Sequence, residues 1–319
     1  RPLAPNWEFA QYVNAASLIP AHIEPYLLKV MMKAKPLIDA RDATLAKDLD
    51  IFIKQEMQHC KQHIAFNKRM HEMGYEWLIP LEQELAATFQ RFLDKKSLRF
   101  SLAYSEGFES LSATACELYF EDYNELLENA DPEPTNLWRW HLAEEFEHRA
   151  ICSDVYHQLS GMNPISTYFY RLYGYFYSIV HLGRFHKMAA KKMLEFDRAG
   201  MSPEELAESV KREKYATKIM SRRFVRYFLK ICSPFYDPAK RREPIVTGPT
   251  SMNLRSATTA RPSPLQLSFG ACRWGREARW RYLLSWPPRG FPMIARPGCS
   301  NNRLSLASRN PPWLSFDTT

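Results

Sequence analysis

Large apolar residues recur in alternating steps of three and four along two segments of the chain, residues 44–74 and 135–161. This spacing is that of the buried face of a packed helix, so both segments are predicted to be long helices. Asp42 stands where it can cap the first helix, and Thr135 or Asn136 where either can cap the second. In the middle of the two buried faces, polar residues replace apolar ones: Glu56, His59, His63, His141, Glu145 and His148.

Helical spacing continues outside these two segments. A first helix is predicted to pass through Glu24, and a third from residue 97 to residue 129, after a link rich in Glu and Pro. The aromatic segment 165–182 and the segment 203–230, which opens with a capping box, add two more helices. The sequence therefore predicts an all-α fold, a four-helix bundle with two additional helices on its C-terminal side.

The polar residues of the two buried faces include two Glu-x-x-His elements, Glu56 to His59 and Glu145 to His148. A Glu and a His three residues apart lie on the same side of a helix. Two such helices that face each other, with one further Glu from each of two more helices, supply the ligands of a dinuclear metal site. The alternative is a metal-free network of Glu–His hydrogen bonds, which we consider weaker because buried carboxylates without a partner are rare.

The other two carboxylates of such a site would come from the first and third helices. On the third helix both Glu106 and Glu109 lie on the buried face, and either could be the ligand. On the first helix the candidate is Glu24, but Pro25 follows it. The residue before a proline is pushed away from helical angles, so Glu24 is expected at a helix start or at a kink.

Two more histidines share the buried faces. His63 follows His59 by four residues, and His141 precedes Glu145 by four. They could be extra ligands, but we expect them to orient ligands through hydrogen bonds, as Glu106 or Glu109 would if it is not itself a ligand. Glu144 and Glu147 point away from the face and are expected in solvent or beside basic residues, although Glu144 can also approach His148 and orient it.

Three strings of residues resemble a bacterial family that is catalogued as predicted metal-dependent hydrolases. The strings are Asn14-Ala15-Ala16-Ser17-Leu18, Gln55-Glu56-Met57-Gln58-His59 followed by His63, and Trp140-His141-Leu142-Ala143-Glu144-Glu145-Phe146-Glu147-His148. The resemblance covers about residues 6–238. It implies a ferritin-like bundle of the di-iron carboxylate superfamily and the metal ligands Glu24, Glu56, His59, Glu106, Glu145 and His148. It implies no known reaction, because the word hydrolase in the family's name is itself a prediction.

Charge and composition change abruptly near residue 239. Residues 239–319 hold 13 Lys and Arg against 3 Asp and Glu, so the formal charge of +8 leaves residues 1–238 with 30 basic and 32 acidic residues. A nearly neutral helical metal-binding domain over residues 1–238 gives no support to nucleic-acid binding. The Pro- and Arg-rich tail is expected to be either a disordered basic arm or a translation out of frame after an indel near residue 245. We favour the second, because disordered tails are usually poor in Trp.

The cysteines and the aromatic segment bear on where the protein works. Six cysteines without a Cys-x-x-Cys pair predict neither a disulfide framework nor structural zinc, and favour a reducing, cytoplasmic location. The first residue is Arg1, so the natural start is expected to lie upstream. Residues 165–182 contain five tyrosines, which favours a helix packed on the bundle over a membrane span. Lining an apolar substrate pocket or resting on a membrane surface are the alternatives for this helix.

The donor set decides which reactions are expected. Four carboxylates with two imidazoles suit two iron ions best, with manganese or zinc as alternatives, and are compatible with O2 activation. We therefore expect an enzyme that oxidises an apolar or aromatic small molecule. The alternatives are hydrolysis of a phosphate or acyl ester at the same metal pair and a metal-binding bundle without catalysis. The oligomeric state is not predicted.

Overall fold

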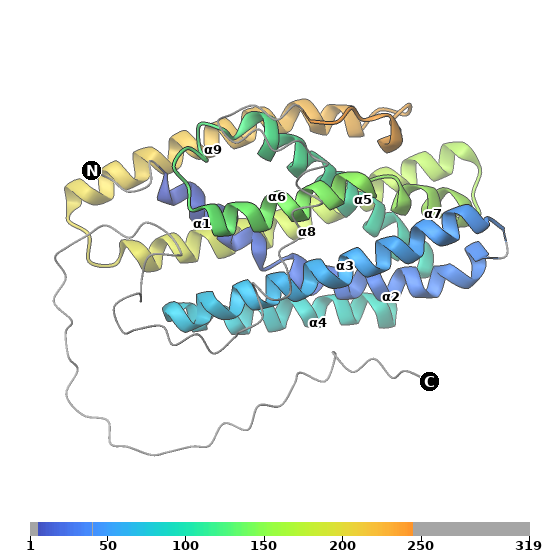
Figure 1. The fold of residues 1–319 in the computed structure, drawn as a ribbon, viewed down its shortest axis with the longest axis horizontal. Helices are drawn as coiled ribbons and strands as arrows, with labels where there is room; N and C mark the ends of the chain where they lie inside the picture. The colour runs from blue at the N-terminus through green and yellow to red at the C-terminus, as the bar shows by residue number, and fades with distance from the viewer. Residues whose placement is uncertain (1–5, 40, 245–319) are drawn as a thin grey trace, which may run out of the picture. The chain divides into compact units, whose positions relative to one another are not determined.

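The computed structural model describes residues 6–39 and 41–244, and every regular element in these ranges is a helix (Figure 1). The α-helices are α1 Trp7–Ser17, α2 Pro20–Asp39, α3 Ala43–Met70, α4 Ile79–Lys95, α5 Leu98–Glu117, α6 Pro132–Glu147, α7 Ile151–Leu159, α8 Pro164–Arg198 and α9 Pro203–Ile231. Short helical turns extend α3 over His71–Leu78 and α5 over Leu118–Asp122, and another lies at Pro238–Lys240. The predicted all-α fold is confirmed. From residue 245 onward, the predicted tail lies outside the described residues.

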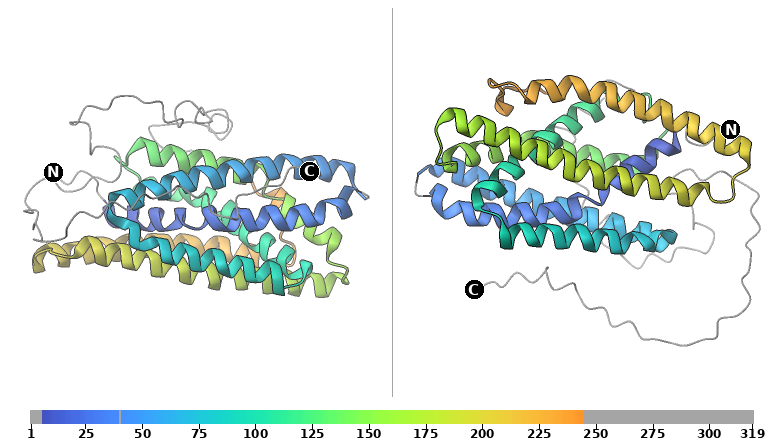
Figure 2. Two further views of the ribbon diagram at one scale, coloured as in Figure 1. Left: turned by 90° about the horizontal axis from the view of Figure 1, so that it is seen from below. Right: turned by 180° about the vertical axis from the view of Figure 1, so that it is seen from behind.

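Four helical segments surround the residues of interest. Helix α2 packs along α3, α5 packs against both α6 and α7, and α3 contacts α7 as well as α6 (Figure 1). In this bundle α6 and α7 together take the place of the predicted fourth helix. Helix α4 packs on α2. The two C-terminal helices pack outside the bundle: α8 lies on both α5 and α1, and α9 lies on α1 (Figure 2).

Several predicted helix ends are confirmed by side chains that cap them. The carboxylate of Asp42 accepts hydrogen bonds from the backbone N–H groups of Thr44 and Leu45 at 3.0 Å. Ser97 caps α5, and Ser202 and Glu205 form the predicted capping box of α9. Helix caps follow local rules, because the unpaired N–H groups of the first turn accept only a few residue types.

The fourth helix differs from the prediction at its start and in its middle. It begins at Pro132 with Asp131 as its cap, and this cap lies four to five residues before the predicted one. It breaks at His148, because the guanidinium of Arg149 donates to the carbonyl oxygen of Phe146 at 2.5 Å and to that of Pro238 at 2.9 Å. The bond to Phe146 occupies a carbonyl oxygen that would otherwise accept the next hydrogen bond of the helix. The break leaves His148 at the C-terminal end of α6.

Two further expectations about helices were wrong. The third helix was predicted to reach residue 129, but it ends at Asp122, and Asn129 has a φ of 58°, which no α-helix accommodates. The expected link between the second and third helices is instead helix α4. Pro80 lies in its first turn, where the missing N–H costs nothing, and Leu85, Phe89 and Phe92 form its buried face.

The aromatic segment 165–182 forms the first half of α8, which packs on the bundle as predicted. Its single charged residue, Arg171, is buried, while Ile165, Phe169 and Tyr173 are exposed on the opposite side. Among the described helices, none has the length and hydropathy needed to cross a bilayer. Contact of the exposed side with a membrane surface stays a prediction.

A chain cut after residue 244 is expected to fold and to bind metal like the full chain. The cut retains Arg241, whose Nη2 lies 2.5 Å from Oε2 of buried Glu117. A chain cut after residue 238 loses that partner, and breaking a buried ion pair costs about 3–5 kcal/mol. Circular dichroism melts and metal content of the two truncations check this. Loss of folding in the longer chain would show that the tail is part of the domain.

Candidate metal centre

Acidic and imidazole side chains from the four bundle segments converge in the interior. Helix α2 supplies Glu24, α3 supplies Glu56 and His59, α5 supplies Glu109, and α6 supplies Glu145 and, at its end, His148. None of these side chains is more than 5% exposed. Glu24 lies one turn inside α2, and the helix continues through Pro25, so Glu24 is not at the helix start. The carbonyl oxygen of Ala21, which Pro25 cannot bond, is approached by the thiol of Cys60 at 3.8 Å.

His59 is held with one ring nitrogen toward the other side chains of the cluster. Its Nε2 lies 3.0 Å from Oε2 of Glu144, and because a carboxylate accepts, Nε2 donates this hydrogen bond. In a neutral ring Nδ1 carries no hydrogen, and this atom faces the cluster, 3.3 Å from Glu56 Oε1 and 3.7 Å from Glu145 Oε1. Glu144 is therefore buried and orients His59, so the expectation that it lies in solvent or beside basic residues, or approaches His148, was wrong. Trp140 Nε1 donates to the second oxygen of Glu144 at 3.1 Å.

His148 decides between the two candidate carboxylates of the third helix. Its Nε2 lies 3.1 Å from Glu56 Oε1, and its Nδ1 lies 3.4 Å from Glu109 Oε2. Glu106 instead faces away, with Oε1 3.4 Å from the guanidinium of Arg171. The structure thus brings Glu109 into the cluster and leaves Glu106, which the resemblance implied as a ligand, in an ion pair outside it. The ion pair accounts for the burial of Glu106 without metal.

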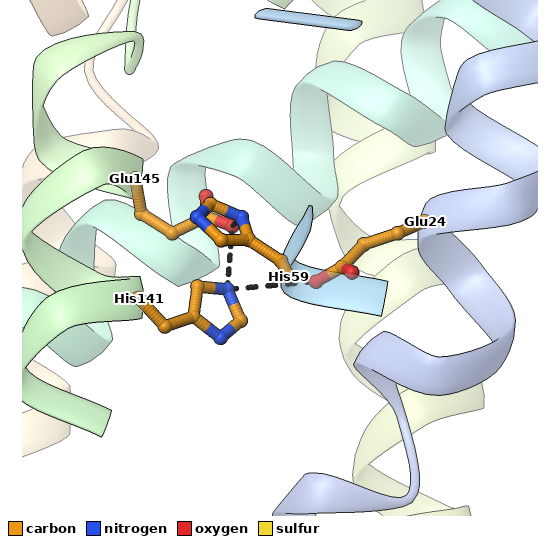
Figure 3. A group of neighbouring side chains, drawn as sticks. All are labelled: Glu24, His59, His141 and Glu145. Atoms are coloured by element: carbon orange, nitrogen blue, oxygen red, sulfur yellow. Dashed lines mark hydrogen bonds and ion pairs between the residues drawn. The ribbon is translucent and has the colours of Figure 1, made fainter. Parts of the chain in front are cut away.

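His141 belongs to the same cluster. Its Nε2 lies 2.8 Å from Glu145 Oε1 and 3.5 Å from Glu24 Oε1, and both contacts are drawn in Figure 3. Its Nδ1 lies 2.6 Å from Nε2 of His63, which in turn reaches the hydroxyl of Ser17 at 2.8 Å. His63 thus contacts another histidine and not a carboxylate of the cluster.

The candidate ligand atoms form two overlapping groups. One contains Glu24, His59, His141 and Glu145, the other contains Glu56, His59, Glu145 and His148, and within each group all ligand atoms lie within 4.8 Å of one another. His59 and Glu145 belong to both. Two metal ions that share these residues would be neighbours, which is the arrangement that a dinuclear carboxylate site requires.

Unsatisfied polar atoms test whether the cluster fits metal or a hydrogen-bond network. Among the described residues, both oxygens of Glu24, Glu56 and Glu109 and both ring nitrogens of His148 are buried without a hydrogen-bond partner. The nitrogen–oxygen contacts between these imidazoles and carboxylates, at 3.1–3.5 Å, lack hydrogen-bond geometry. Two ligand atoms that are each about 2.1 Å from one metal ion lie about 3 Å apart, which is close to these distances. The residues present fit bound metal better than the metal-free network.

The electrostatics of the cluster also favour a cation. Burial raises the pKa of Glu24 and of Glu109 well above the ordinary value, and the neighbouring carboxylates raise it further. Burial and the charge of Glu56 raise the pKa of Glu145 to about 7. Burial would raise the pKa of Glu56 too, but hydrogen bonds and positive charge from the protonated forms of His148 and His59 outweigh burial and hold that pKa low. The same contacts raise the pKa of His59 to about 9 and that of His148 well above its ordinary value. The carboxylates are thus too close together for all of them to ionise without positive charge between them, which bound metal or protonated imidazoles would supply.

Sequence reasoning missed two members of the surroundings, Ser17 and Asn67. Both are buried and hydrogen-bonded to each other, and Ser17 also contacts His63. The signal was present, since Ser17 lies in the first of the three strings that carry the resemblance. Glu147 is exposed, as predicted, and its Oε2 accepts a hydrogen bond from Gln55 at 3.3 Å.

Comparison with known proteins agrees with these observations. The model of a family described as predicted metal-dependent hydrolase matches residues 3–242. No curated protein and no solved structure matches the chain. The relation to the ferritin-like superfamily therefore stays a prediction from the sequence strings and the bundle. With a match that spans the helical domain and a buried cluster of carboxylates and imidazoles inside it, the chain belongs to the family of predicted metal-dependent hydrolases.

Proposed function

We propose that the protein is a dinuclear metal enzyme that uses O2 to oxidise an apolar or aromatic small molecule. The observation that supports this is the donor set within one bundle: the three buried carboxylates and three imidazoles of the two ligand groups, with the carboxylate of Glu109 beside His148. Oxygen-rich sets with some imidazole suit iron, and next manganese, rather than the thiolate-rich sets of structural zinc. Bound iron would supply the electrons that O2 chemistry needs.

The protein's own residues prepare this site in three ways. Glu144 fixes the orientation of His59 through its hydrogen bond to Nε2. Aromatic rings cover the imidazoles and exclude water: Phe52 has its ring centroid 4.8 Å from that of His148, and Trp140 lies 5.0 Å from His59. A dry, apolar wall suits a small apolar reactant such as O2 better than a hydrated anion.

Hydrolysis is the second candidate, because the family is named for it. A metal pair supplies hydrolysis with acidified water and a polarised ester oxygen. A phosphate ester would have to lose its hydration to reach carboxylates that are no more than 1% exposed, which makes this reading weaker. The third candidate is a bundle that binds metal without catalysis.

Elemental analysis of the purified protein, with optical spectra before and after O2 reaches the reduced protein, separates these candidates. About two irons per chain and an absorbance change on O2 addition are the expected results for the oxidase. Zinc, with turnover of phosphate or acyl esters and no response to O2, would overturn it in favour of hydrolysis. Bound metal with neither response would leave the non-catalytic bundle.

The proposal includes a cytoplasmic location. The four cysteines of the described residues, Cys60, Cys116, Cys152 and Cys232, are all free, and three are buried. Free thiols are typical of reducing compartments.

A further inference from the structure

A chain of hydrogen bonds leads from helix α4 to the cluster. It passes from Glu82 through Asn67, Ser17 and His63 to His141, over distances of 3.4, 2.8, 2.8 and 2.6 Å. All five residues are buried. Because the partners at one end of the chain accept hydrogen bonds but cannot donate them, the position of each hydrogen along it can be derived.

The direction is set at Asn67. Its side-chain Nδ2 donates to the backbone carbonyl oxygen of Ser17 at 3.2 Å and to the carboxylate of Glu82 at 3.4 Å. Burial would raise the pKa of Glu82, but contacts with His22 and His71 outweigh it and lower that pKa, so Glu82 is an ionised acceptor. Flipping the amide would place its oxygen against two acceptors. The amide oxygen Oδ1 is therefore the atom that faces the hydroxyl of Ser17.

Each following step has one solution. The hydroxyl of Ser17 has one hydrogen, and it donates this hydrogen to Oδ1 of Asn67. His63 Nδ1 must then donate to the hydroxyl oxygen. The other nitrogen of the neutral His63 ring, Nε2, carries no hydrogen, so His141 Nδ1 must donate to it. In the neutral ring of His141 the free lone pair is consequently on Nε2.

This lone pair points at two carboxylates. Nε2 of His141 lies 2.8 Å from Glu145 Oε1 and 3.5 Å from Glu24 Oε1, and Figure 3 shows the ring nitrogen between them. Three electron-rich atoms around one buried point repel one another unless a cation holds them together. We propose that Nε2 of His141 is a metal ligand, beside Glu24 and Glu145, and that Asn67, Ser17 and His63 are positioning residues that hold its ring in this tautomer.

The inference rests on the proposed metal site and adds to it a ligand that the resemblance did not imply. It makes the two metal positions unlike each other: His141 serves the one beside Glu24, and His148 the one beside Glu56. The alternative occupant of the point is a proton, which would make His141 an imidazolium paired with Glu145.

Cadmium binding to the unmodified protein with isotope-labelled histidine tests the ligand directly. A scalar coupling between bound cadmium and Nε2 of His141, beside couplings to His59 and His148, is the expected NMR result. Couplings to His59 and His148 without one to His141 would overturn this inference and leave the metal site standing. Absence of any cadmium binding would overturn the metal site itself, and with it this inference.

The relay is tested by Ser17→Ala, with Ser105→Ala as the matched control. Ser105 is an equally buried helical serine, but its hydroxyl bonds the carbonyl oxygen of Ser101 at 2.8 Å, outside the relay. Ser17→Ala should weaken cadmium binding, by less than the roughly 10- to 100-fold that loss of a ligand's own hydrogen-bond partner costs, because Ser17 reaches His141 only through His63. It should also make the nitrogen chemical shifts of His141 in the apoprotein those of mixed tautomers. Ser105→Ala should change neither. Unchanged shifts in Ser17→Ala would show that the relay does not set the tautomer.

Discussion

Replacing His59 or His148 with alanine is expected to remove most of the bound metal, whereas Glu147→Ala leaves it in place. His59 and His148 are buried and lie 3.1–3.4 Å from carboxylates of the cluster. Glu147 precedes His148 at the end of α6 but is exposed. Loss of a direct ligand should weaken binding by more than the roughly 10- to 100-fold that loss of a ligand's partner costs. Metal content after dialysis, with binding isotherms for manganese and zinc, provides the measurement.

A control for folding accompanies these variants. His186→Ala removes a histidine whose Nε2 contacts the backbone carbonyl oxygen of Tyr12 at 2.8 Å, and Tyr12 is not part of the cluster. It should keep its metal even if it lowers the melting temperature. Equal metal loss from His59→Ala, His186→Ala and Glu147→Ala would mean that the cluster is not the binding site.

The sequence predicted the parts of the site that depend on local spacing. Glu56 with His59 and Glu145 with His148 lie on one helix face because of their three-residue separation, and flanking apolar residues mark that face as buried. The same reasoning could not choose between Glu106 and Glu109. The residues of α5 are buried on all sides of the helix, so the spacing of its apolar residues does not indicate which face meets the cluster.

Long-range contacts explain the other misses. The helix break beside His148 depends on Arg149 and carbonyl oxygens about 90 residues later, a pairing without a local signal. Ser17 and His63 are 46 residues apart and meet only because α1 and α3 pack together. Glu144 on α6 contacts His59 on α3, 85 residues away in the sequence. Local pattern therefore predicted which residues are buried, while packing between helices determined which atoms meet.

Metal is expected to raise the melting temperature of the unmodified protein markedly, since ions that bind only the folded state add RT ln(1 + [L]/Kd). At a thousandfold excess over Kd this amounts to about 4 kcal/mol. Calorimetry with and without iron, manganese or zinc measures the shift. A melting temperature that responds to none of these metals would contradict the metal site.

Glu109→Gln and Glu106→Gln turn this shift into a test of the assignment on α5, because the same change is made one helical turn apart. The raised pKa of Glu109 means that the folded apoprotein loses stability as pH rises above the ordinary value of 4.5. Glu109→Gln removes that loss, because the amide has no charge at any pH. The variant should therefore have a more stable apoprotein and little or no response to metal.

Glu106→Gln should do the opposite on both counts. It leaves the buried guanidinium of Arg171, 3.4 Å away, without its carboxylate partner, which costs about 3–5 kcal/mol. Its response to metal should persist, because its carboxylate pairs with Arg171, whereas that of Glu109 contacts His148. If instead Glu106→Gln abolished the metal response and Glu109→Gln kept it, the ligand implied by the family resemblance would be right, and the α5 face described here would be wrong.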